Sequence, residues 1–128
     1  MALNRALRLR KSSEFQKVRQ QGRTLTSRLL ILTWAPNESA KLRIGFVVSK
    51  RISKLAVRRN YIKRLLGEAI RPVLRELPSG WDIVLSARHQ ASAADLPTLQ
   101  LDIRTLLQRA RLLPSEYAGE SKVEGTQR

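Results

Sequence analysis

The chain of 128 residues carries 25 Lys and Arg against 10 Asp and Glu, a formal net charge of +15, and 42% of its residues are hydrophobic. This length and apolar content fit one folded domain with a single core. So large a positive excess indicates a polyanionic partner, nucleic acid first, because such binding releases condensed counterions. Without cysteine and with one histidine, the chain excludes disulfide frameworks, thiolate metal sites and most histidine-based catalysis.

The hydropathy pattern indicates neither a membrane span nor a signal peptide. No run of 18 or more apolar residues occurs, and the first twenty residues interleave Arg and Lys with Leu. We therefore expect a cytoplasmic protein without a membrane partner. We predict a single nucleic-acid-binding domain over residues 1–113 with a basic arm at 1–11. Residues 114–128 have no apolar pattern and are expected to form a disordered tail.

The N-terminal third predicts a short helix followed by strands. Ser12 or Ser13 can cap the helix, and Gly22 offers a left-handed stop. Residues 24–35, TLTSRLLILTWA, predict one or two strands, and residues 42–49, LRIGFVVS, predict another that pairs antiparallel with them. Both faces of these strands are largely apolar. We therefore expect helices on at least one face of the sheet and a ligand or terminal helix on the other.

Residues 49–73, SKRISKLAVRRNYIKRLLGEAIRPV, predict a long helix on which the domain is organised. Its apolar residues recur at helical spacing and should face the core: Ile62, Leu65, Leu66, Ala69, Ile70 and Val73. Pro72 predicts a kink or an early end, because it removes a backbone donor. The opposite side should point outward and carries Asn60, Lys63, Arg64, Gly67 and Arg71.

The outward face of this helix favours nucleic-acid binding over a merely solvated surface. Glu68 is the only acid between Lys41 and Arg75, and unbalanced like charges repel. Guanidinium groups can grip phosphate with two hydrogen bonds, and Asn60 can reach a base or a ribose hydroxyl. Gly67 either allows a backbone to approach closely or is simply tolerated within the helix.

The C-terminal third predicts one more strand and one more helix. Residues 81–87, WDIVLSA, have a hydrophobic middle, and Ala94-Asp95 offers a cap for a helix that continues through Arg111. The element order is therefore α-β-β-(β)-α-β-α. This order predicts an α+β fold, a two-layer sandwich with a central, roughly four-stranded mixed sheet packed by the long basic helix.

The run RIGFVVSKRISKLAVRRNYIKRLLGEAIR resembles the signature of the protein subunit of bacterial ribonuclease P. In that family a strand ending Gly-x-x-Val-x-Lys-Lys/Arg precedes a helix reading A-x-x-R-N-x-I-K-R-x-x-R-E. The matching positions are Gly45, Val48, Lys50, Arg51, Ala56, Arg59, Asn60, Ile62, Lys63, Arg64 and Glu68. The family often has Arg where this chain has Tyr61, and usually Arg where it has Gly67. The resemblance covers roughly residues 5–112 and implies a ribosomal protein S5 domain 2-like fold.

The resemblance also implies a role in an RNA-based enzyme. In that system the RNA subunit, with bound Mg²⁺, removes the 5′ leader of precursor tRNA, and the protein binds the RNA and the leader. We therefore expect ribonuclease P RNA and precursor tRNA as partners, with no small-molecule substrate. We expect no catalytic residue and no metal held by the protein alone. The scattering of the ten acids fits this division, because no carboxylate cluster suits metal-dependent phosphodiester cleavage.

Two sets of site residues follow from the resemblance and from the charge pattern. The RNA subunit is predicted to contact Lys50, Arg51, Lys54, Arg58, Arg59, Asn60, Lys63, Arg64 and Arg71. A cleft between the first helix and the sheet is predicted to hold the leader, bordered by Phe15, Lys17, Arg19, Ile31, Thr33, Arg88 and His89. Phe15 matches the aromatic that the family carries on this helix, and Arg19 replaces a second aromatic common one turn later. Phe15 could stack on a base or pack in the core.

The sequence alone predicts the environment of three further side chains. Trp34 lies on the strand face opposite Ile31 and Thr33 and is expected in the core, as is Trp81. His89 has no acidic or nucleophilic neighbour, which is typical of a surface or loop residue.

Two rival functions share the basic surface. A ribosomal-protein-like binder of structured RNA would need no leader cleft and would have no processing role. A DNA-binding regulator would place the helix in a major groove and would require dimer symmetry, and the sequence offers no dimerisation seam.

Overall fold

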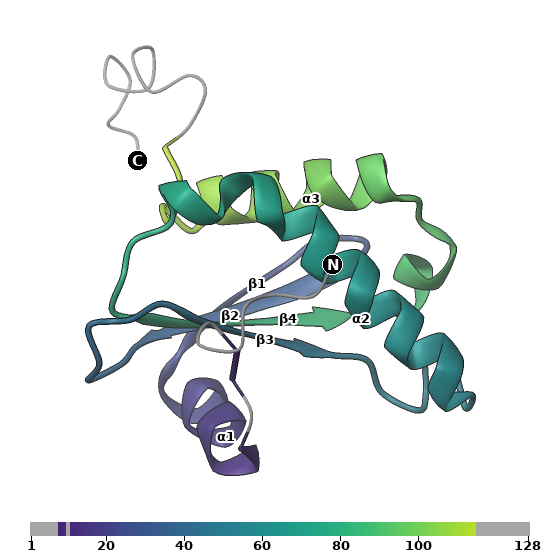
Figure 1. The fold of residues 1–128 in the computed structure, drawn as a ribbon, viewed down its shortest axis with the longest axis horizontal. Helices are drawn as coiled ribbons and strands as arrows, with labels where there is room; N and C mark the ends of the chain where they lie inside the picture. Colours follow the sequence, from purple (N-terminus) through teal and green to yellow (C-terminus); the bar gives the residue numbers. More distant parts are fainter. Residues whose placement is uncertain (1–7, 10, 115–128) are drawn as a thin grey trace.

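The computed structural model describes residues 8, 9 and 11–114, so most of the predicted arm and all but the first residue of the predicted tail lie outside the described residues. The domain boundary at residue 113 stays a prediction. The elements, drawn in Figure 1, are α1 (Ser12–Gln21), β1 (Arg23–Thr26), β2 (Leu30–Pro36), β3 (Arg43–Val47), α2 (Ala56–Ile70), η2 (Arg71–Glu76), β4 (Trp81–Ala87), η3 (His89–Ala93) and α3 (Leu96–Arg109).

The four strands form one mixed sheet in the order β1-β2-β4-β3. The pairs β1–β2 and β2–β4 are antiparallel, and β3 pairs parallel with β4. The predicted α+β fold with a four-stranded mixed sheet is confirmed, and residues 24–35 contribute two strands. The predicted pairing of the 24–35 and 42–49 runs is wrong. After β3 the chain crosses over through α2 and returns as β4, which inserts between β2 and β3 and leaves β3 at the edge.

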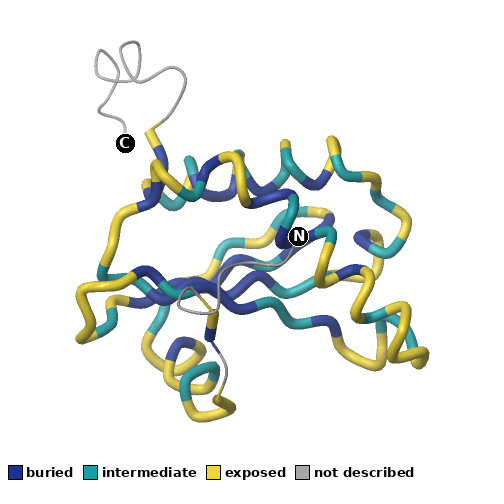
Figure 2. Tube along the Cα trace, in the orientation of Figure 1, coloured by how far each residue is buried: buried dark blue, intermediate teal, exposed yellow. Residues whose placement is uncertain are grey.

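Helices cover both faces of this sheet. Helices α2 and α3 pack together on one face, and α1 covers part of the other (Figure 1). Figure 2 shows that the buried segments follow the strands and the inner sides of α2 and α3. The largest fully buried side chains are Leu30, Leu32, Ile44, Ile62, Leu66, Ile70, Ile83, Leu85, Leu99, Ile103, Leu106 and Leu107. Each buried aliphatic side chain of this size stabilises the fold by about 1.5–3 kcal/mol.

Helix α2 is shorter than the predicted 49–73 segment at both ends. The predicted apolar stripe is confirmed, with five of its side chains buried and Leu65 half-buried. The helix begins only at Ala56, because the backbone of Leu55 before it is extended, with ψ 120°. The amides of Ile52 and Ser53 donate to the carbonyl of Ser49 and close a separate turn. It ends at Ile70 and gives way to the tighter η2 helix, which carries Pro72 in its first turn. The early end predicted from Pro72 is therefore confirmed.

Both ends of α1 differ from their predicted chemistry. The capping position is Lys11 rather than Ser12 or Ser13, and its N–H donates to Glu14 Oε1 at 3.1 Å. Gly22 has φ −92°, so it is not a left-handed stop. Its N–H donates to Val18 O at 2.7 Å, and a Cβ at this position would lie 2.6 Å from Trp34 O and closer still to Val18 O. Glycine is required here for space, because the helix end lies directly on strand β2.

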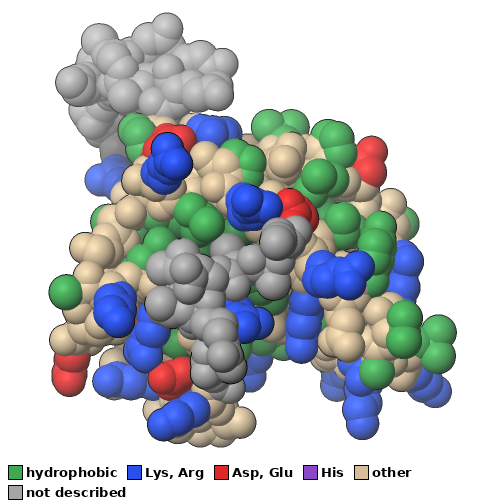
Figure 3. Space-filling model, in the orientation of Figure 1, with side chains coloured by type: hydrophobic (Ala, Val, Ile, Leu, Met, Phe, Trp, Pro, Cys, Tyr) green, Lys and Arg blue, Asp and Glu red, His purple; other side chains and the backbone are tan. Residues whose placement is uncertain are grey.

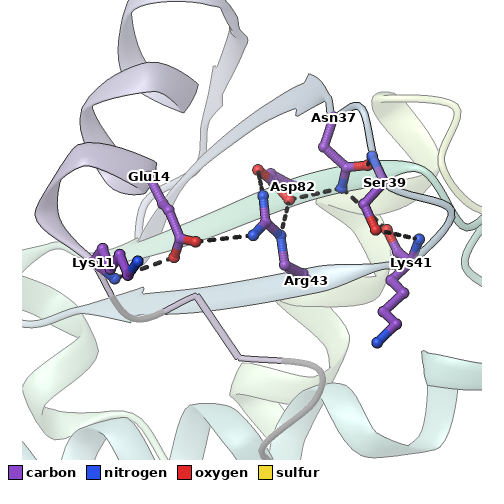
Figure 4. A network of polar contacts seen from close by, with 7 residues as sticks. All are labelled: Lys11, Glu14, Asn37, Ser39, Lys41, Arg43 and Asp82. Carbon is purple, nitrogen blue, oxygen red and sulfur yellow. Dashed lines mark hydrogen bonds and ion pairs between the residues drawn. The ribbon is translucent and has the colours of Figure 1, made fainter.

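A polar network holds α1 on the sheet (Figure 4). The Arg43 guanidinium donates to both carboxylate oxygens of Asp82 and to Glu14 Oε2, each at 2.9 Å. Asp82, which is almost fully buried, is the main cause of the raised pKa of Arg43. Asn37 Nδ2 donates to Asp82 Oδ1 at 2.8 Å and to the Lys41 carbonyl at 3.0 Å. The network thereby joins α1, β3, β4 and the loop between β2 and β3.

Helix α3 begins as its sequence predicts. Asp95 caps it by accepting from the Thr98 N–H at 3.0 Å, and the hydrogen bonds from Thr98 lower the pKa of Asp95. Trp34 is buried among the core side chains, as predicted, whereas Trp81 is partly buried and packs against them.

One crowded glycine, Gly22, and one uncrowded glycine, Gly67, allow a test of stability. We expect Gly22→Ala to lower the free energy of unfolding by about 1–3 kcal/mol, because the new Cβ would overlap two carbonyl oxygens. Gly67→Ala is the matched control, since its Cβ would approach Phe46 Cε2 only to 3.8 Å and alanine favours the helix by up to about 1 kcal/mol. Chemical denaturation measures both. Equal stability of Gly22→Ala and the parent protein would contradict the crowding at α1.

Candidate RNA interface

Helix α2 presents its cations away from the core. Because the apolar stripe faces α3 and the sheet, the remaining side chains must point to solvent. All but one of the residues predicted to contact an RNA subunit are exposed: Lys50, Arg51, Lys54, Arg58, Asn60, Lys63, Arg64 and Arg71. The exception is Arg59.

Arg59 and Arg71 are engaged within the protein. Arg59 is half-buried, and its Nη1 donates to the carbonyls of Ser53 at 3.0 Å and Lys54 at 2.9 Å. The guanidinium of Arg59 turns back to the turn before α2 and is more enclosed than the exposed side chain of Lys63. Arg71 lies 3.4 Å from Glu68, an exposed ion pair of the kind that contributes little to stability.

A hollow of about 500 Å³ lies along the edge strand β3, between α1 and α2. We call it the edge hollow, and it is lined by Arg8, Leu9, Phe15, Ile44, Gly45, Phe46, Asn60, Lys63, Arg64 and Gly67. Three polar or cationic residues of α2 thus share one cavity with an aromatic residue of α1. The predictions had assigned these residues to two separate sites.

Two glycines shape the edge hollow. Gly67 is buried beside Phe46, so the prediction that it points outward is wrong. The ring of Phe15 lies so close to Gly45 that a Cβ there would come within 2.5 Å of Phe15 Cζ. Phe15 packs with Leu9 yet stays half-buried at the cavity wall. The ring of Phe15 therefore packs against the protein on one side and can contact a ligand in the edge hollow on the other.

The part of the sheet that α1 leaves uncovered forms a second concave surface. We call it the open sheet face, and it is lined by Arg19, Thr24, Ile31, Thr33, Val47, Ser49, Ser86 and Ala87. The hydroxyl groups of Thr24 and Thr33 lie 3.4 Å apart across β1 and β2. This surface combines polar and aliphatic side chains of the strands with Arg19 of α1.

The predicted leader residues are thus divided among several places. Arg19, Ile31 and Thr33 lie together on the open sheet face, whereas Phe15 lines the edge hollow. Lys17 is exposed on α1. Arg88 and His89 follow β4 and do not line either concave surface, and Arg88 Nη1 donates to the Ser27 carbonyl at 2.6 Å.

Several lining residues were not predicted. The missed positions are Arg8, Leu9, Ile44, Gly45, Phe46 and Gly67 in the edge hollow, and Thr24, Val47, Ser49, Ser86 and Ala87 on the open sheet face. The alternation of residues 43–47 was a usable signal, because it places Gly45 and Val47 on the strand face opposite Ile44 and Phe46. The position of Arg8 beside β3 could not be predicted from the sequence. It depends on a hydrogen bond from the Leu9 N–H to Ile44 O, at 3.0 Å, between segments far apart in the chain.

The acids are placed away from both concave surfaces. Within the described part of the chain, no Asp or Glu lines the edge hollow or the open sheet face. Glu14 and Asp82 bind Arg43, Asp95 caps α3, and Asp102 accepts a hydrogen bond from Ser27. Figure 3 shows Lys and Arg side chains gathered over the lower half of the molecule, around α1 and the beginning of α2. This charge distribution suits a polyanion.

The described residues form neither a metal-binding cluster nor a membrane-spanning helix. Among residues 8, 9 and 11–114, no three His, Asp or Glu side chains come together in a way that could hold a metal ion. None of the helices in the same residues is long and apolar enough to cross a membrane.

The fold and the charged surfaces define a small basic α+β protein built to bind a polyanion. The family model for ribonuclease P matches residues 3–111, and the chain belongs to this family. It is 47% identical over 115 residues to the ribonuclease P protein component of Chloroflexus aurantiacus, covering 88% of this chain and 84% of that protein. It is 42% identical over 120 residues to the component of Roseiflexus sp. strain RS-1, covering 93% and 98%.

Solved structures agree with this assignment. The ribonuclease P protein of Staphylococcus aureus superposes with a TM-score of 0.77 at 27% identity, covering 85% of this chain and 99% of that one. The protein of Thermotoga maritima gives a TM-score of 0.71 at 29% identity, covering 80% and 96%. The family resemblance of the sequence is therefore confirmed.

Charge removal at the edge hollow should be visible in the salt dependence of RNA binding. We expect the Lys63→Ala, Arg64→Ala double variant to reduce the slope of log affinity against log salt by about two, one for each lost phosphate contact. Its thermal unfolding should stay unchanged, because both side chains are exposed. Arg59→Ala is the contrasting variant. It should lower the melting temperature, since the carbonyl groups of Ser53 and Lys54 lose the side-chain donor that they bind. An unaltered slope in the double variant would contradict the interface.

Proposed function

We propose that this chain binds the RNA subunit of ribonuclease P and the 5′ leader of precursor tRNA, in the cytoplasm, while the RNA with bound Mg²⁺ performs the cleavage. The observation that carries the proposal is the edge hollow, where Asn60, Lys63 and Arg64 meet Phe15 and no acid is present among the described lining residues. Membership of the ribonuclease P family supports the same role.

The RNA subunit is assigned to the outer side of α2 and the turn before it. The cations there are Lys50, Arg51, Lys54, Arg58, Lys63, Arg64 and Arg71, with Asn60 beside them. A helix is a rigid support, so its cations can match the fixed spacing of phosphates in a structured RNA. Arg59 contributes by holding residues 53 and 54 in place rather than by binding phosphate itself.

The leader is assigned to the open sheet face and to Phe15. Single-stranded RNA binds where cations follow its phosphates and where flat or aliphatic groups meet its bases. Arg19 supplies the charge, and Ile31 and Val47 supply the apolar contact on the open sheet face. Phe15 adds an aromatic ring at the neighbouring edge hollow.

The proposed division of labour follows from the chemistry of the side chains. Metal-dependent phosphodiester hydrolysis uses a metal-activated nucleophile, and the described residues provide no carboxylate cluster for such a metal. Cations on the protein can instead offset the repulsion between two RNA molecules. Mg²⁺ ions that only screen this repulsion then become dispensable, whereas those that take part in cleavage stay with the RNA.

The decisive experiment is reconstitution of leader cleavage with a bacterial ribonuclease P RNA. We expect protein plus RNA to cleave precursor tRNA at a low Mg²⁺ concentration at which the RNA alone is slow, and protein alone to do nothing. A ribosomal-protein-like binder, which the family match does not favour, would bind RNA without this stimulation. Absence of stimulation, or equal affinity of the complex for precursor and leaderless tRNA, would overturn the proposed function.

Phe15 gives a separate prediction about the leader. We expect Phe15→Ala to weaken binding of precursor tRNA by the reconstituted complex by about 1–3 kcal/mol, the usual contribution of one stacked base, while mature tRNA is bound equally well. Phe15→Leu is the matched control, because it keeps an apolar side chain against Gly45 and Leu9 but removes the ring. If Phe15→Leu binds precursor as the parent does, packing rather than stacking explains this residue.

A further inference from the structure

The beginning of α2 carries an apolar patch that the core does not use. Among the described residues, four large hydrophobic side chains are exposed, and three of them are Leu55, Val57 and Tyr61 at 69%, 82% and 44% exposure. We call these three the Tyr61 patch. Val57 and Tyr61 are neighbours at i and i+4 on the same helix face. Figure 3 shows hydrophobic side chains grouped with Lys and Arg at the lower right, where α2 begins in Figure 1.

The ring of Tyr61 is held in place from one side. The guanidinium carbon of Arg58 lies 5.4 Å from the ring centroid, within the range of a cation–π contact. The same guanidinium donates through Nη2 to the carbonyl of Ser92 in η3. Arg58 is therefore fixed between η3 and the ring, and Tyr61 is a positioned aromatic surface rather than a freely rotating side chain.

The charges around the patch decide which partner fits it. Arg51, Lys54, Arg58 and Arg64 are exposed and lie within a few residues of the patch in the chain, and Glu68, one turn beyond Arg64, is partly buried and paired with Arg71. An apolar protein surface or an acyl chain would leave these cations without counter-charges. An unpaired nucleotide satisfies both halves, since its base has an apolar face and its flanking phosphates are anionic.

We infer that the Tyr61 patch is a stacking platform for an unpaired base of the RNA to which α2 binds, with Tyr61 under the base and Arg51, Lys54 and Arg58 near the flanking phosphates. The inference rests on the proposed function and adds to it a contact that reads an exposed base rather than the phosphate backbone. Val57 extends the platform by one helical turn.

Salt dependence separates stacking from charge contacts. Full-length variants are bound to ribonuclease P RNA over a range of KCl concentrations. We expect Tyr61→Ala to lower the affinity about tenfold at every salt concentration with an unchanged slope, because stacking releases no counterion. Tyr61→Phe should bind within twofold of the parent, since it keeps the ring. Tyr61→Arg should steepen the slope by about one, and Arg58→Ala should flatten it by about one.

The outcomes also separate this inference from the proposed function. If the parent protein stimulates leader cleavage and Tyr61→Ala binds the RNA as tightly as Tyr61→Phe, the stacking platform is overturned and the proposed function stands. Thermal unfolding of Tyr61→Ala checks that the fold is intact. Sedimentation is the last control, since self-association of the parent that Val57→Glu abolishes without changing RNA affinity would assign the patch to protein contacts and overturn the inference.

Discussion

The placement of α1 depends on the guanidinium of Arg43. It joins the almost fully buried Asp82 of β4 to Glu14 of α1, with three contacts of 2.9 Å. Removing one member of such a cluster leaves a charge in a poorly solvated place, which is far more costly than losing a surface ion pair. Because Glu14 is fixed, Phe15 comes to lie against Gly45, and α1 covers only part of the sheet. Both concave surfaces follow from this constraint.

The insertion of β4 between β2 and β3 determines where the cations of α2 lie relative to the sheet. It leaves β3 at the edge of the sheet, where one side of the strand meets α1 and the other meets α2. Asn60, Lys63 and Arg64 can therefore reach the same hollow as Phe15. Had β3 paired with β2, its edge would have been covered, and the cations of α2 would have faced solvent without an aromatic neighbour.

Several acids stabilise the fold. Glu14 and Asp82 join α1 to the sheet through Arg43, Asp102 accepts a hydrogen bond from Ser27, and the exposed Asp95 caps α3. The cations of α2 are therefore left with little internal compensation along the interface, a repulsion that a polyanion would relieve. In the proposed function this imbalance lets the protein supply positive charge and surfaces for bases, and we assign the chemistry of cleavage to the RNA and its Mg²⁺.

The sequence by itself determined the apolar stripe of α2, the early end at Pro72, the Asp95 cap of α3 and the family, because each is encoded in residues that are neighbours in the chain. Only the tertiary structure decided the strand order, the burial of Gly67, the bend of Arg59 toward backbone carbonyls, and the cavity that Phe15 and Lys63 share. These depend on pairing between distant segments and on where a long side chain finds its partners. Helical spacing gives the face on which Arg59 begins, but not the carbonyls of Ser53 and Lys54 toward which it bends.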